Sequence, residues 1–121
     1  MDLVRVGTGA DVSQGDIVLD AAGSITDLNT GLDVFALSAG AVNLTADNLT
    51  MTARAGSINV DTRVRSINSQ SALGTQIDEF NTVTLNSDIA TNGAIRVDSG
   101  DTMTVDFVQS ATDNEVNDIS L

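Results

Sequence analysis

The chain has 121 residues, of which five are basic and 17 are acidic, so its formal net charge is −12 at pH 7. Because nucleic acids and anionic membranes bind basic surfaces, this balance argues against both as partners. The chain contains no Cys and no His, which excludes disulfides, thiolate nucleophiles and the commonest transition-metal ligand. Hydrophobic residues make up 41% of the chain but aromatic residues only 2%, so the core must be aliphatic.

Alternation of apolar and polar residues, which is typical of strands with one buried face, runs through most of the chain. In chain order the apolar positions are Ile17/Leu19, Val34 with Phe35 and Leu37, Val42/Leu44, Leu49/Met51, Ile58/Val60, Val83/Leu85, Ile95/Val97 and Met103/Val105. Groups that contain Gly separate these pairs and supply turns. No segment has apolar residues at helical spacing, so the sequence predicts an all-β protein with almost no helix.

One phrase returns along the chain. It runs from Gly15 to Ile25 as Gly-Asp-Ile-Val-Leu-Asp-Ala-Ala-Gly-Ser-Ile and recurs loosely at 37–44 and 51–60. Such a repeat indicates one supersecondary unit stacked on copies of itself. Apolar anchors follow one another at steps of about 14 to 20 residues, and they are Leu19, Leu37, Met51, Ile67, Leu85 and Val105. We therefore predict a parallel β-helix, or β-solenoid, of about five to six irregular coils, with an antiparallel β-sandwich as the alternative.

The whole chain, 1–121, is predicted to form a single solenoid segment. The alternation is weakest at 61–80, so we expect an irregular coil or a lateral loop there; the residues that interrupt the pattern are Arg63, Arg65, Gln70 and Gln76. Neither end of the chain carries an amphipathic helix of the kind that caps a solenoid. We therefore expect a fragment of a longer repetitive protein, or a subunit that stacks end to end.

The phrase at 15–25, with its recurrences at 36–44 and 53–60, resembles the repeats of filamentous-haemagglutinin-type bacterial surface proteins. The coils of those large exoproteins and adhesins follow a Gly-Asp/Asn-Ile-x-Leu-x-Ala-x-Gly-x-Ile pattern. The resemblance covers about 15–105, with a gap across 61–80. It implies a right-handed parallel β-helix, secretion and a role at the cell surface. It transfers no catalytic residue, because those repeats are scaffold.

Calcium is the one cofactor that the sequence suggests, through Asp98, Asp101 and Asp106. These three residues flank the last strong alternating segment and supply the hard oxygen ligands that calcium prefers. A second acidic group lies near the C-terminus and comprises Asp113, Asn114, Glu115 and Asp118. Neither group has the spacing of an EF-hand loop, and the Gly-Gly-x-Gly-x-Asp nonapeptide of calcium-binding β-rolls is absent.

No catalytic residue is predicted. In so acidic a chain, some carboxylates lie close together by chance, so such a pair does not indicate glycoside hydrolysis. The chain has no His, and the aromatic residues on which sugars stack are scarce. The predicted function is a non-catalytic rod or stalk segment of a large secreted or cell-surface adhesin of bacterial type. Two alternatives remain open: a self-assembling extracellular filament subunit and a carbohydrate-active β-helix protein.

The expected partners follow from this function. They are neighbouring coils of the same polypeptide or further copies bound end to end, together with host or matrix glycans or proteins. Every apolar run is broken within a few residues, so no membrane insertion is expected.

Overall fold

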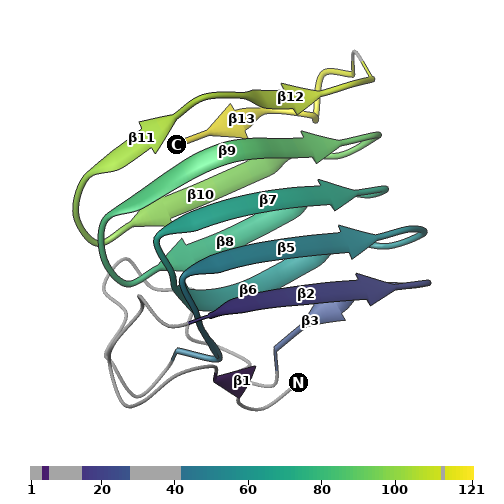
Figure 1. Ribbon diagram of the computed structural model, residues 1–121. Helices are drawn as coiled ribbons and strands as arrows, with labels where there is room; N and C mark the ends of the chain where they lie inside the picture. The colour runs from purple at the N-terminus through teal and green to yellow at the C-terminus, as the bar shows by residue number, and fades with distance from the viewer. Residues whose placement is uncertain (1–3, 6–14, 28–41, 113) are drawn as a thin grey trace.

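The computed structural model describes residues 4–5, 15–27, 42–112 and 114–121, and Figure 1 shows its strands in two facing layers. The layer in front in that view, the front sheet, comprises β2 (Asp16–Ala21), β5 (Asn48–Ala53), β7 (Ser66–Ser71), β9 (Val83–Ala90), β11 (Met103–Val105) and β12 (Val108–Ser110). The back sheet comprises β1 (Val4–Arg5), β3 (Ile25–Thr26), β4 (Leu44–Thr45), β6 (Ile58–Arg63), β8 (Thr75–Glu79), β10 (Ile95–Ser99) and β13 (Ile119–Ser120).

Every strand pairing among the described residues is parallel, in the front sheet and in the back sheet alike. In Figure 1 the chain runs along a front strand, returns along the following back strand, and rises to the next front strand. This path is a right-handed coil, the usual sense for parallel strands joined by crossovers. The predicted parallel β-helix is confirmed, and the antiparallel sandwich is excluded.

The first coil is longer than the others. Asp16 pairs with Asn48, 32 residues further along the chain, whereas Asn48 pairs with Ser66 after only 18 residues. Two short strands, β3 and β4, both pair with β6, so one coil occupies the length in which the sequence predicted two. The described strands make about four turns, compared with the predicted five to six. The anchor Leu37 lies outside the described residues.

Inward-facing aliphatic side chains form columns along the stack of coils, which we call the rod. One column of the front sheet, in register from coil to coil, contains Ile17, Leu49, Ile67 and Leu85. A column of the back sheet contains Val60, Ile77 and Val97. Because each such side chain contributes about 1.5–3 kcal/mol when buried, a narrow interior can be stable without aromatic residues.

Residues 61–80 contain the end of β6 and all of β7 and β8, where the sequence predicted an irregular coil or a lateral loop. The strands leave no long loop at 61–80, and the register with the next coil shifts between Ile67 and Asn68. The alternation was hard to see because polar residues are buried in this coil, namely Asp61, Thr62, Ser69, Ser71, Thr75, Asp78 and Glu79. The Arg63 guanidinium, which also interrupted the pattern, lies 4.2 Å from the centre of the Phe80 ring. Of the buried polar residues, Thr62, Ser69, Ser71, Thr75 and Glu79 face inward and form a polar section in the middle of an otherwise aliphatic core.

A β-bulge in β9 changes which residues of that strand face the core. Ile67 and Asn68 are consecutive on β7, but their partners on β9 are Leu85 and Ser87, which leaves Asn86 as an extra residue. A bulge of this kind shifts the inward and outward positions of every residue that follows it in the strand.

The bend between β9 and β10 packs closely against the bend of the preceding coil. A Cβ on Gly93 would lie 2.0 Å from the carbonyl oxygen of Leu73, so the backbone would have to move. We expect Gly93→Ala to lower the free energy of unfolding by about 1–3 kcal/mol in a urea titration. Gly23→Ala, in the bend between β2 and β3, is the control: its Cβ would meet no heavy atom within 4 Å, and the expected change is about 0.5 kcal/mol or less. Equal losses in both variants would contradict this close packing.

Candidate functional site

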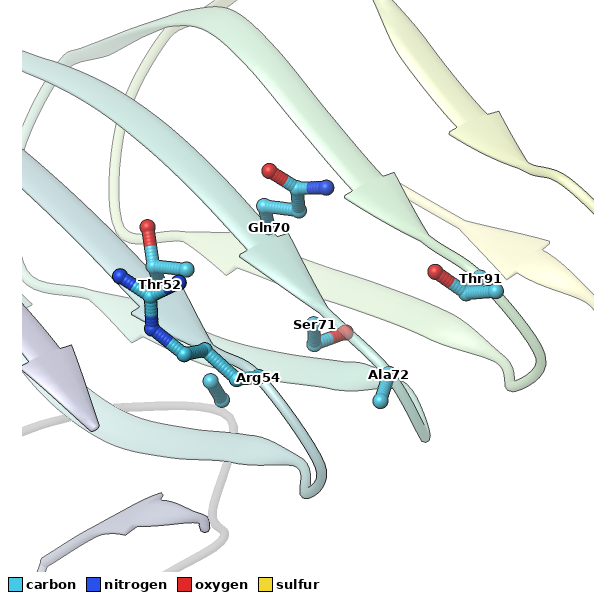
Figure 2. A pocket seen from close by; sticks show the side chains of 7 residues that line it. Thr52, Arg54, Gln70, Ser71, Ala72 and Thr91 are labelled. Atoms are coloured by element: carbon cyan, nitrogen blue, oxygen red, sulfur yellow. The ribbon is translucent and has the colours of Figure 1, made fainter. Parts of the chain in front are cut away.

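A hollow of about 210 Å³ lies on the outer side of the front sheet, where β5 and β7 end. Its lining comes from three successive coils and consists of Thr52, Ala53, Arg54, Gln70, Ser71, Ala72 and Thr91. Figure 2 shows Thr52 and Gln70 on neighbouring strands, with the Arg54 side chain beside Thr52 and Thr91 just past the end of β9. The hollow presents hydroxyl, amide and guanidinium groups to the solvent.

The guanidinium at this hollow is held by a carboxylate. Arg54 Nε donates a hydrogen bond of 2.8 Å to Asp20 Oδ1, and Arg54 Nη2 also contacts Asp20 Oδ2. The hydrogen bond lowers the pKa of Asp20 and raises the pKa of Arg54. Because both side chains are largely exposed, this pair orients Arg54 more than it stabilises the fold.

The lining of the hollow does not form a catalytic arrangement. None of the seven lining residues is a carboxylate, so the paired acids of glycoside hydrolysis are not provided there. No general base lines the hollow beside the hydroxyls of Thr52 and Thr91. The groups present are suited to hydrogen-bonding a polar ligand.

The three candidate calcium ligands lie in different surroundings. Asp98 is on β10 and forms an ion pair with Arg96. Asp101 follows β10 and accepts a hydrogen bond of 3.3 Å from the Thr82 hydroxyl. Asp106 is exposed between β11 and β12. Across the described ranges, no group of three or more acidic, His or Cys side chains is arranged to hold a metal ion.

The second acidic group is at the surface as far as it is described. Asn114, Glu115 and Asp118 are exposed, and Asp113 lies outside the described residues.

Four buried acids were missed by the sequence reasoning. Glu79 and Asp88 face the core, whereas Asp61 and Asp78 are buried on the outer side of the back sheet. Asp78 is the register partner of both Asp61 and Asp98, so three carboxylates follow one another across the back sheet. Asp61 and Asp78 both have interaction partners.

Glu79 joins two successive coils from the inside. Its carboxylate accepts a hydrogen bond of 2.6 Å from the Thr62 hydroxyl and others from the backbone N–H groups of Val64, at 3.1 Å, and Asn81, at 3.1 Å. Burial raises the pKa of Glu79 to about 7, although these hydrogen bonds lower it in part. One signal in the sequence pointed to Glu79: it follows Ile77 at the alternating spacing and therefore shares its face.

Asp88 is completely buried, with 0% of its surface exposed. It faces the core because the bulge at Asn86 reverses the alternation, and Ile89 is half-buried on the outer face instead. Burial raises the pKa of Asp88, and the nearby hydroxyls of Ser69 and Thr75 lower it in part. Simple alternation predicts the reverse placement of Asp88 and Ile89, so the sequence carried no signal for this acid.

These features define the class of protein: a right-handed parallel β-solenoid with a polar section in its core and a shallow polar hollow on one face. Among the described residues, no helix has the length and hydropathy needed to cross a membrane. Comparisons of the chain with protein-family models, with curated proteins and with solved structures found no match.

Proposed function

We propose that this chain is a non-catalytic structural segment of a rod or stalk, part of a large secreted or cell-surface adhesin. The observation that carries the proposal is the register of the coils, in which each coil places its core residues directly on those of the coil before it. Such a stack lengthens without changing its cross-section, which is the property that a stalk requires. The likeness of 15–25 to adhesin repeats supports the location outside the cell.

The last coil supports the idea that the rod binds a further coil at this end. Most of the large hydrophobic residues that are exposed in the described chain belong to it, namely Val105 (41%), Phe107 (47%), Val116 (71%), Ile119 (46%) and Leu121 (55%). Exposed apolar groups gathered at one place indicate an interaction surface. A following coil would cover these side chains and would pair with the outer edge of β11 and β12.

A second candidate function, a self-assembling filament subunit, is favoured by the match between the two ends. β2 is the last strand at one end of the front sheet, and β11 is the last at the other. Val105 continues the register column that starts at Ile17, and Thr104 continues the one that starts at Asp16. A second copy placed with its β2 on β11 would extend both columns in register, and repeated head-to-tail contacts of this kind produce filaments.

We expect the isolated chain to associate end to end, and more strongly in high salt. Both ends carry exposed acids, such as Asp16 on β2 and Asp106 beside β11, and salt screens their repulsion. In sedimentation velocity, the weight-average mass should rise with protein concentration and with ionic strength. Replacing Phe107 and Ile119 by Asp should abolish the rise.

The control for this experiment is Leu73→Asp. Leu73 is 59% exposed but lies in the bend between β7 and β8, away from both ends. Association should survive this change. A strictly monomeric chain at high salt would contradict the filament. If Leu73→Asp removed the association, or if the chain with Asp at Phe107 and Ile119 still associated, the last coil would not be the surface that binds the next copy.

The register of the contact can be tested by cross-linking, since the chain has no Cys of its own. A mixture of Asp16→Cys and Thr104→Cys chains should form cross-linked pairs under mild oxidation. A mixture of Asp16→Cys and Asn68→Cys chains should not, because Asn68 lies on β7 in the middle of the rod. Equal yields from both mixtures would reject the proposed alignment.

A further inference from the structure

The strongest unexplained feature of the core is the position of Asp88. The bulge in β9 turns this acid into the interior and leaves Ile89 on the outer face. If the strand alternated regularly through Asn86, without the bulge, it would bury Ile89 and expose Asp88. Bulges of this kind serve to redirect a particular side chain, so the inward carboxyl has to be explained.

The surroundings of Asp88 consist of hydroxyl groups and aliphatic side chains. Ser69 is its register partner on β7, and Val108 is its partner on β12. Thr75 lies near it across the interior, within 3.1 Å of the Ser71 hydroxyl. Neither carboxyl oxygen of Asp88 has a hydrogen bond of ordinary geometry within the described part of the chain, and the buried Ser69 hydroxyl has none either.

No cationic side chain of the described residues faces Asp88. β7 and β12 carry no charged residue, and Asp88 is the only one on β9. On β8, Asp78 alternates to the outer side and Glu79 lies at the far end of the strand from Thr75. On β10, Arg96 and Asp98 form an ion pair on the outer side.

An ionised carboxylate with no cation to offset its desolvation is strongly unfavourable in such an interior. We propose that Asp88 is held in the core as the neutral carboxylic acid, and that loss of its proton, at a pH where surface carboxylates are already ionised, loosens the coil of β9 and β10. In the neutral form its O–H can donate to the hydroxyl oxygen of Ser69 or Thr75 by a small side-chain rotation. The ionised form would have only neutral hydroxyl groups of the described residues as partners and no cation to offset the burial of its charge, so it would draw water into the core.

This arrangement gives the rod a response to pH that its composition otherwise lacks. The chain has no His and no Cys, so its ordinary side chains do not titrate between about pH 5.5 and pH 8. The direction of the pKa of Asp88, raised by burial, agrees with a neutral acid. Glu79, further along the same interior, also has a raised pKa, and the experiment must separate the two.

The test compares the wild type with Asp88→Asn, Glu79→Gln and the double variant in urea unfolding from about pH 5.5 to about pH 8.5. The midpoint of the wild type should fall as the pH rises. Each single variant should fall less, and the double variant should not change across this range. Asp106→Asn, at an exposed acid, should follow the wild type and serves as the control.

Infrared spectroscopy supplies a readout that does not depend on stability. At a pH where surface carboxylates are ionised, the wild type should keep absorbance from a protonated carboxyl group, and Asp88→Asn should lose part of it. The proposal would be overturned if Asp88→Asn kept the full carboxyl absorbance, or if this variant were less stable than the wild type by the same amount at every pH. It would also be overturned if sodium or calcium, at constant ionic strength, stabilised the wild type but not Asp88→Asn. The last result would assign a cation to this interior.

Discussion

Replacing Leu85 by Asp should strongly destabilise the rod, whereas the same replacement at its neighbour Thr84 should be tolerated. Leu85 is 0% exposed and stands in the middle of a front-sheet core column, between Ile67 and Val105. A carboxylate there would be buried without a partner, so we expect a loss of at least about 3 kcal/mol in the free energy of unfolding. Thr84 lies on the outer face, in register between Ser66 and Thr104. Asp at this position should change the free energy of unfolding by about 0.5 kcal/mol or less.

The two variants differ by one position, so the comparison tests the strand register directly. Urea unfolding followed by circular dichroism provides the measurement. If the two losses are equal, or if the Thr84 variant loses more, the side of β9 that faces the core before the bulge has been assigned wrongly.

Removing the Glu79 carboxyl should be the second large effect. Glu79→Ala removes the acceptor of two buried donors, from Thr62 and Val64, and of the partly buried N–H of Asn81, and it also creates a cavity. We expect a loss of about 3–5 kcal/mol at pH 5, measured by urea unfolding. Glu79→Gln keeps an acceptor oxygen and nearly the same volume, so it should lose much less. Equal losses in the two variants would show that the hydrogen bonds contribute little.

The same acid should make the stability fall with rising pH. The pKa of Glu79 is about 7 in the folded chain and near its ordinary value of 4.5 in the unfolded chain. The folded state therefore holds more protons between these values, and the stabilisation is complete below about pH 4.5 and is lost as the pH rises through 7. The change is on the order of 3 kcal/mol. Glu79→Gln should lack this part of the pH dependence; a variant with the full dependence would reject the role of Glu79.

Much of the fold was predictable because its signals are local. The alternation at Ile17/Leu19, Leu49/Met51 and Ile95/Val97 predicted strands that the structure contains. The repeated phrase predicted a stacked unit, and in the structure it forms β2, a bend and β3. The number of coils was harder to predict, since spacing alone did not show that β3 and β4 lie side by side on β6.

The candidate sites were much less predictable. The hollow around Arg54 and Gln70 joins residues of different coils, and no spacing in the sequence marks it. Asp98, Asp101 and Asp106 were selected because they are close in sequence, but the structure gives Asp98 and Asp101 separate partners.

The sequence by itself determined the fold class of this protein, through a two-residue period, Gly-containing bends and the absence of helical spacing. It also determined that the core is largely aliphatic and that no His or Cys titrates near neutral pH. Only the tertiary structure decided that Asp88 and Glu79 lie inside. A buried acid depends on groups from neighbouring coils, such as Thr62 for Glu79, which is 17 residues away. A strand bulge is likewise defined by the register with the adjacent strand. Both are properties of pairs of distant segments, whereas alternation is a property of one segment alone.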